Sequence, residues 1–180
     1  MATPQNQDTS APRAPNRFIT DHNAAGLSVF DASIPEAVPT QAMGRMSFQL
    51  GYATTSLPAD FSSGADVAQY SSFLTGPPPG IYIPGGSVLR IVEMQPGGAS
   101  PMHRTVSLDY GVVLDGAAEL VLDSGESRVL ERGDMVVQRG TNHLWRNKSA
   151  TETSRMLFVT LESKPVEVGG KLLSEDLAGL

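Results

Sequence analysis

The sequence predicts an all-β protein built as an antiparallel barrel or sandwich. Eighteen glycines and thirteen prolines in 180 residues indicate many turns, which favours short strands over long helices. From residue 81 onward, short runs with alternating apolar residues follow one another at close spacing, and no helical periodicity separates them. Strands spaced in this way are typical of antiparallel all-β folds.

The part of the chain before residue 81 predicts fewer elements. Residues 1–16 are polar and rich in proline, so we expect a disordered tail there. The runs RFIT and LSVFD predict two strands around a turn at residues 22–26, and MSFQLGYATT (46–55) predicts another strand. Residues 56–80 form a long connection punctuated by Pro and Gly, with one short helix over DVAQYSSFL. A connection of this length is typical of a lid or of an ordered segment wrapped over the surface.

The part of the chain after residue 81 supplies most of the predicted sheet, with strands in the runs SVLRIVEM, DYGVVL, AELVLD, SRVLE, DMVVQ and RMLFVTLE. The tetrapeptide Asp-Ser-Gly-Glu at 123–126 predicts a hairpin connection, because Asp starts turns and Gly adopts a positive φ at low cost. We expect one barrel domain over residues 17–165. Residues 166–180 are then a C-terminal tail that ends in a short helical turn.

Composition excludes several classes of function. A formal net charge of −6 leaves no basic face for nucleic acid. The chain has no cysteine, which excludes disulfides, thiolate nucleophiles and cysteine metal sites. It has no apolar run near the ~20 residues that span a bilayer and no basic-then-apolar secretory signal. We therefore expect a cytoplasmic protein that binds neither nucleic acid nor membrane.

Two segments, residues 97–116 and 133–147, carry the candidate chemistry. Each opens on Gly and presents one of the chain's three histidines on an expected strand. Because alternate residues of a strand share a face, His103 and Thr105 point the same way, and a turn after them lets Asp109 meet His103. By the same parity His143 and Trp145 share a face.

These two segments resemble the two motifs of the cupin superfamily, small barrels of the jelly-roll or double-stranded β-helix type. The resemblance covers roughly residues 81–162. His103 matches the first ligand of the family's metal site, and His143 matches the last. Thr105 stands where the family has a second His, and Asp109 stands where it has Glu. The resemblance implies a single-domain barrel with a degenerate metal motif, and homodimers are common among small cupins.

The resemblance and the residues together predict a small-molecule enzyme of the lyase or isomerase type. His103, His143 and Asp109 are the expected catalytic residues, since imidazoles and a carboxylate in an apolar pocket exchange protons near neutral pH. Thr105, Gln138 and Trp145 are the expected substrate-binding residues. The reaction class is dehydration, decarboxylation or isomerisation of a carbonyl or carboxylate compound, within secondary metabolism by analogy.

Two alternatives stay open at this point. Two histidines and one carboxylate can hold iron, which makes a metal-dependent dioxygenase the first alternative. The same three residues, His103, Asp109 and His143, could hold Zn or Mn in place of iron. The lyase or isomerase hypothesis requires no cofactor. The second alternative is a non-catalytic barrel that binds a small ligand. Outside the motifs we expect His22 on the surface and Arg104 as a solvated charge.

Overall fold

The computed structural model describes residues 12–179 and confirms the all-β antiparallel fold. The elements of this part of the chain are β1 (Ile19–His22), β2 (Ser28–Asp31), β3 (Thr40–Met43), β4 (Met46–Thr54), η1 (Ser62–Gly64), α1 (Ala65–Thr75), β5 (Ser87–Met94), β6 (Ser107–Asp115), β7 (Ala117–Leu122), β8 (Ser127–Glu131), β9 (Met135–Arg139), β10 (His143–Arg146), β11 (Ser154–Glu162), β12 (Val166–Val168) and β13 (Lys171–Leu173). The helix expected in the long connection is α1, and the hairpin expected at 123–126 joins β7 to β8.

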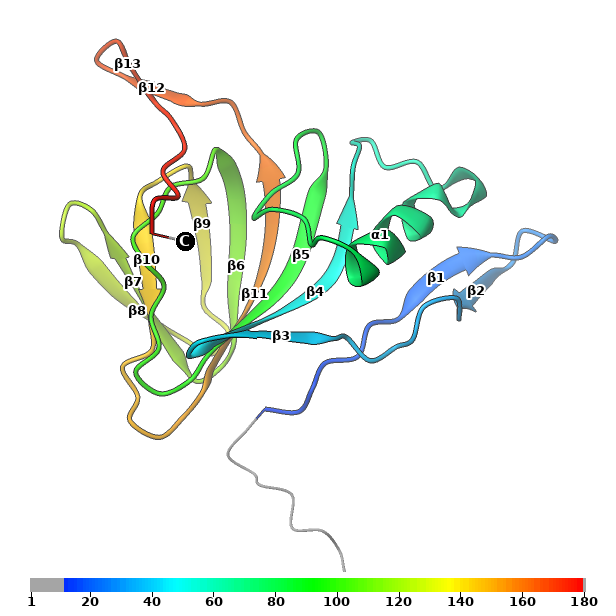
Figure 1. Cartoon of the computed structure of the whole chain (residues 1–180), viewed down its shortest axis with the longest axis horizontal. Coiled ribbons are helices and arrows are strands. Elements are labelled where there is room, and N and C mark those ends of the chain that lie inside the picture. The colour runs from blue at the N-terminus through cyan, green and yellow to red at the C-terminus, as the bar shows by residue number, and fades with distance from the viewer. Residues whose placement is uncertain (1–11, 180) are drawn as a thin grey trace, which may run out of the picture.

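Within residues 12–179 the barrel consists of two facing sheets (Figure 1). The larger one has six strands in the order β3-β4-β5-β11-β6-β9, and the smaller one has three in the order β10-β7-β8. All the pairings within both sheets are antiparallel. This is the jelly-roll type of barrel that the sequence predicted.

An apolar core lies between the two sheets of the barrel. Met94, Val113 and Met156 of the large sheet pack with Trp145 of β10 in one buried cluster. The Trp145 indole meets the ring of Phe158 on β11 edge-on, with 5.8 Å between ring centroids. Burying such large apolar side chains is the dominant favourable contribution to folding, so this contact holds the two sheets together.

The helix α1 covers the other part of the large sheet. Its Tyr70 is fully buried and shares a second apolar cluster with Ala53 of β4 and Val88 of β5. The Tyr70 hydroxyl donates a hydrogen bond of 2.8 Å to the carbonyl of Leu50, so the polar end of this buried ring is satisfied. The helix is therefore fixed against the sheet, and the segment that follows it returns over the sheet to β5 (Figure 1).

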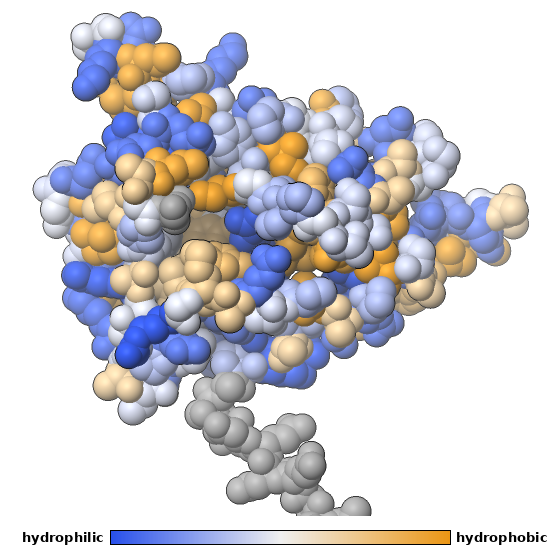
Figure 2. Space-filling model, viewed as in Figure 1, coloured by the Kyte–Doolittle hydropathy of each residue, from blue (hydrophilic) through white to orange (hydrophobic). Residues whose placement is uncertain are grey.

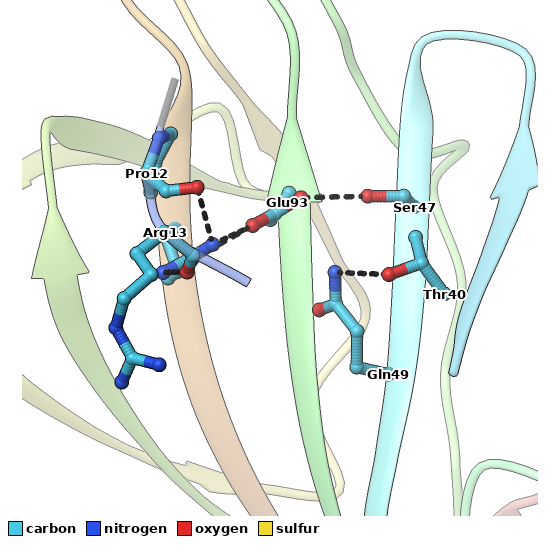
Figure 3. Close-up of polar contacts among 7 residues, drawn as sticks. Pro12, Arg13, Thr40, Ser47, Gln49 and Glu93 are labelled. Carbon is cyan, nitrogen blue, oxygen red and sulfur yellow. Dashed lines mark hydrogen bonds and ion pairs between the residues drawn. The ribbon is translucent and has the colours of Figure 1, made fainter. Parts of the chain in front are cut away.

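The N-terminal segment contacts the barrel from residue 12 onward, which corrects part of the expected tail (Figure 3). Arg155 of β11 donates to the carbonyl oxygen of Arg13 over 2.7 Å and to that of Pro12 over 3.3 Å. The same guanidinium forms an ion pair with Glu93, whose other oxygen accepts from Ser47 over 2.9 Å. A partly buried arginine satisfies several acceptors at once, so it holds residues 12 and 13 on the sheet. The rest of the expected tail, residues 1–11, lies outside the described residues.

The C-terminal segment also differs from expectation. Residues 166–173 form the hairpin β12–β13, and residues 174–179 contain no helix, only a turn at residues 178 and 179. Asp176 instead forms an isolated antiparallel bridge with Arg104, with backbone hydrogen bonds of 2.8 and 2.9 Å. This pairing satisfies backbone groups that a single helical turn would leave unpaired, and it places the segment beside the first histidine motif.

Candidate functional site

The candidate site lies in the barrel interior where the two sheets face each other. Asp109 of β6 pairs across the sheet with Gln138 of β9 on one side and with Thr160 of β11 on the other. His103 forms a backbone bridge with His143 of β10, and their ring centroids are 4.5 Å apart. All five side chains are buried. The structure thus brings together the three residues that the sequence predicted as catalytic.

His103 keeps one ring nitrogen available. Its Nδ1 lies 2.9 Å from the carbonyl oxygen of Pro101. A carbonyl only accepts, so Nδ1 carries the hydrogen and Nε2 holds the lone pair of the neutral ring. Among the described residues no side chain or backbone group hydrogen-bonds this Nε2. A bound molecule can therefore use it.

His143 is held in a chain of hydrogen bonds that uses both of its nitrogens. The Trp145 indole donates over 3.1 Å to Oε1 of Gln138, and because an indole N–H only donates, this bond fixes the orientation of the amide. The Gln138 Nε2 then lies 2.6 Å from Nε2 of His143 and 3.0 Å from its Nδ1, so its shorter contact is with Nε2. Nδ1 of His143 lies 2.9 Å from the carbonyl oxygen of Thr141 and carries the hydrogen. Gln138 and Trp145, expected to bind substrate, thus have their polar ends joined to each other and to His143.

The surroundings also keep His143 neutral. Burial lowers the pKa of its imidazole to about 4, because the charged form loses its hydration, and the neighbouring His103 acts in the same direction. The hydrogen bond to the carbonyl of Thr141 opposes this shift only in part. At neutral pH His143 is therefore an uncharged ring with its lone pair directed at Gln138.

The carboxyl of Asp109 stands at the end of a line of hydroxyl groups. Ser107 donates to Oδ1 of Asp109 over 2.6 Å, and the hydroxyls of Thr105 and Ser107 lie 2.7 Å apart. All three side chains are buried. The sequence pattern did not single out Ser107, although it shares strand parity with Asp109 and follows Thr105 by two residues.

Burial raises the pKa of the Asp109 carboxyl, since the ionised form is poorly solvated there. The hydrogen bond from Ser107, and the positive charge that His103 carries when it is protonated, favour the ionised form and oppose this shift. A carboxyl with a raised pKa can hold a proton closer to neutral pH than an exposed one and can give it to a bound molecule.

The arrangement does not fit a metal centre made of two histidines and one carboxylate. Such a centre requires the lone pairs of both imidazoles, and Gln138 occupies that of His143. Across residues 12–179 no three His, Cys, Asp or Glu side chains gather closely enough to hold a metal ion. Thr105, where the resemblance implies a further histidine, is hydrogen-bonded to Ser107.

The barrel interior opens to the outside beside the C-terminal segment. Figure 2 shows the surface hollowed in front of β6 and β9, with apolar residues along part of the rim. Arg104 lies next to this region and is mostly buried, with 18% of its side chain exposed and its ion-pair partner Asp123 3.7 Å away. The expectation of a solvated charge at Arg104 is therefore wrong, because the C-terminal segment pairs with its backbone and shields it. His22 is on the surface, as predicted.

The two sides of the site offer different chemistry. On one side His103 presents a free ring nitrogen that can accept a proton, and Asp109 is a carboxyl that burial favours in its protonated form. On the other side His143 forms a neutral wall with Gln138 and Trp145. A small molecule in contact with His103 and Asp109 can lose a proton at one atom and gain one at another.

Comparison with known proteins gives matches over most of the chain. The profile of the cupin domain matches residues 90–160. Phomopsin biosynthesis cluster protein D of Diaporthe leptostromiformis is 64% identical over 174 residues, which covers 96% of this chain and 92% of that protein. Oryzines biosynthesis cluster protein J of Aspergillus oryzae is 45% identical over 163 residues, or 90% of each chain. The cupin-domain-containing oxidoreductase fogC of Aspergillus ruber is 39% identical over 167 residues, covering 91% of this chain and 80% of that protein.

Solved structures match with lower sequence identity. The polyketide cyclase RemF from Streptomyces resistomycificus aligns with a TM-score of 0.47 at 22% identity, covering 68% of this chain and 72% of that one. Across residues 12–179 no helix has the length and hydropathy needed to cross a bilayer.

Proposed function

This chain belongs to the cupin family, and we propose that it is a small-molecule enzyme of biosynthetic metabolism that works by acid/base chemistry inside the barrel. The relatives named for the phomopsin and oryzine biosynthesis clusters support the biosynthetic role. The reaction is of the lyase or isomerase type, that is, dehydration, decarboxylation or isomerisation of a carbonyl or carboxylate compound.

The observation that carries this proposal is the free Nε2 of His103 beside a buried carboxyl whose pKa is raised. His103 takes a proton from the carbon next to the substrate carbonyl, and Asp109 gives its proton to the carbonyl oxygen, which leaves an enol. Positioned groups of this kind typically accelerate a proton transfer about 10²–10⁴-fold. Gln138 and Trp145 keep the facing wall neutral, so His103 does not meet a second positive charge.

Deuterium exchange tests the proposal without knowledge of the natural substrate. The full chain is incubated in D₂O with pyruvate, 2-oxobutyrate and acetoacetate, and proton NMR follows the carbon next to each carbonyl. We expect catalysed exchange, or loss of CO₂ from acetoacetate, that falls at least about 100-fold in His103→Gln and in Asp109→Asn. His22→Gln is the matched control, because it makes the same substitution at an exposed histidine. Equal rates in the wild-type protein and both site variants would reject the proposal.

The second candidate is an oxidoreductase, and the names of four relatives favour it. The geometry does not fit a metal held by His103, Asp109 and His143. A metal-dependent reaction therefore needs a different set of ligands. Metal analysis of protein purified without an affinity tag tests this candidate. Stoichiometric iron, together with activity lost on chelation and regained on adding iron, would favour it over acid/base chemistry.

A homodimer and a cytoplasmic location complete the proposal. The outward face of the large sheet supports the dimer, because Tyr110, Met135 and Val137 are apolar and between 45% and 77% exposed there. Exposed apolar patches of this kind often mark protein contacts. Sedimentation equilibrium tests the dimer, and Tyr110→Glu should shift it toward monomer.

A further inference from the structure

Arg90 is a partly buried cation that the acid/base chemistry does not use. It lies in the middle of β5, where it pairs with Leu50 of β4 and with Phe158 of β11. Phe158 faces the interior against Trp145, and cross-strand partners share a face, so Arg90 also points inward. The sequence placed no function on this residue.

Part of the Arg90 guanidinium is fixed by the loop that follows α1. Its Nη2 donates to the carbonyl of Gly80 over 2.9 Å and to that of Pro79 over 3.4 Å. Thr160, next to Asp109 in the sheet, donates to the carbonyl of Ile81 over 2.6 Å. Both interior-facing side chains therefore attach the loop to the sheet, and Figure 1 shows this loop crossing in front of β5 and β11.

The remaining donors of Arg90 have no partner within the described part of the chain. No Asp or Glu of residues 12–179 forms an ion pair with it, and neither Nε nor Nη1 donates to a described group. Nε and Nη1 of Arg90 keep contact with solvent, whereas Nε of Arg104 is buried without a hydrogen-bond partner. Burial lowers the pKa of the guanidinium, but an arginine stays charged in proteins. Arg90 therefore presents a positive charge to the interior that no carboxylate of residues 12–179 pairs with.

We propose that Arg90 binds the carboxylate of the substrate through its charge and a hydrogen bond from Nε or Nη1, and that the substrate is a small carboxylic acid. This inference names the substrate class of the proposed site and so rests on the proposed function. With Nη2 held by the loop carbonyls, Nε and Nη1 each remain as a single donor, and the charge of the group strengthens a hydrogen bond from either to a carboxylate oxygen. Leu50 and Phe158 flank Arg90 in the sheet, so apolar side chains border this contact. The carboxylate lies on the β5 and β11 part of the interior, and the reacting carbon extends toward His103 and Asp109.

Tryptophan fluorescence tests this proposal, because Trp145 is the single tryptophan of the chain and its ring touches Phe158, the neighbour of Arg90. The probes are butyrate and its uncharged analogue butyramide, titrated into the full chain at constant ionic strength. We expect butyrate to change the Trp145 emission saturably, with a dissociation constant at least about tenfold below that of butyramide.

Three variants locate the contact. Arg90→Gln should raise the butyrate dissociation constant at least about tenfold and leave that for butyramide unchanged. Arg90→Lys should lie between, since Lys keeps the charge but places it on a single ammonium group in place of the planar guanidinium. Arg139→Gln is the matched control, because Arg139 follows Gln138 on β9 but is exposed. Circular dichroism checks that each variant folds. If Arg90→Gln does not fold, Arg90→Lys still decides the point.

Equal binding of butyrate and butyramide by the wild-type protein, or unchanged butyrate binding in Arg90→Lys and Arg90→Gln, would overturn the role of Arg90. Deuterium exchange is a separate readout. Exchange that survives in the His103 and Asp109 variants, together with Arg90-dependent butyrate binding, would reject the acid/base chemistry alone. Exchange that is lost in the His103 and Asp109 variants, together with butyrate binding that does not depend on Arg90, would reject the carboxylate contact alone.

Discussion

The two motif histidines share one interior and differ in what surrounds them. His103 and His143 lie 4.5 Å apart between ring centroids, and each places Nδ1 2.9 Å from a backbone carbonyl two residues earlier in the chain. The contrast is at Nε2, which has no hydrogen-bond partner among residues 12–179 in His103 and accepts a hydrogen from Gln138 in His143. Two residues that match equivalent places in a family motif can therefore have different roles.

One neighbour produces this difference. Gln138 bridges Trp145 and His143 because its amide both accepts and donates. A hydrophobic residue at 138 would leave the indole N–H and the imidazole lone pair buried without partners, which costs free energy. The comparison predicts that substitutions at His103 act on turnover, whereas those around His143 act first on stability.

The largest expected effect is on turnover at His103. His103→Gln removes the proton acceptor but keeps a side-chain donor for the Pro101 carbonyl. We expect deuterium exchange to fall about 10²–10⁴-fold, while the free energy of unfolding in urea changes by less than about 1 kcal/mol. A similar loss of exchange in His22→Gln would show that the effect is not specific to the site.

The next effect is the pH dependence of stability that His143 causes. Its pKa is about 4 in the folded protein and about 6.5 when unfolded. As pH falls from 6.5 to 4.5 the unfolded chain gains a proton that the folded protein does not, so stability falls by roughly 2–3 kcal/mol. Urea unfolding at several pH values in wild-type protein and His143→Gln measures this as a difference, which cancels the contribution of Asp109. Parallel pH profiles for the two proteins would contradict a neutral, buried His143.

Substitution of Gln138 tests the bridge itself. Gln138→Leu removes both hydrogen bonds at similar volume and leaves two buried polar groups unpaired, so we expect the free energy of unfolding to fall by about 1–3 kcal/mol. The double variant Gln138→Leu/His143→Phe should recover part of this loss, because one unpaired group is gone. Additive losses in the double variant would mean that the two side chains do not interact.

The smallest effect concerns the hydroxyl that supports Asp109. Ser107→Ala removes a donor to the ionised carboxylate, which favours the protonated form and raises the pKa of Asp109 further. The exchange rate depends on pH in part through the protonation of Asp109. In Ser107→Ala this part of the pH profile should move to higher pH, and the maximum rate should change less than tenfold. Thr105→Val removes the outer hydroxyl alone and should move this part of the profile less. A shift toward lower pH in Ser107→Ala would contradict the direction of this hydrogen bond.

The sequence predicted the barrel and the inward direction of the motif residues, because strand parity places alternate side chains on one face. It also predicted that His103, Asp109 and His143 would meet. Parity does not reveal which nitrogen of a histidine is free, since that depends on contacts between different strands, such as Gln138 with Trp145.

Arg90 and the chain ends show a second limit of sequence patterns. Arg90 has the same parity as Val88 and Val92 in an apolar run, so strand parity alone places it on the inward face of this strand. The pairing of residue 12 onward with Arg155, and of Asp176 with Arg104, joins segments far apart in the chain. Local composition carries no information about such pairings, so the sequence did not predict the contacts that residues 12–13 and Asp176 make with the barrel.

The central claim is that His103 offers a free lone pair and His143 does not. Diethyl pyrocarbonate acylates imidazole nitrogens that hold an available lone pair, and mass spectrometry of the digested protein locates each product. At pH 6 the low pKa of His143 leaves its ring uncharged, so charge does not protect it. We predict rapid modification of His22, slower but complete modification of His103, and protection of His143 that is lost in Gln138→Leu. Modification of His143 at the rate of His103 in the wild-type protein would contradict the account.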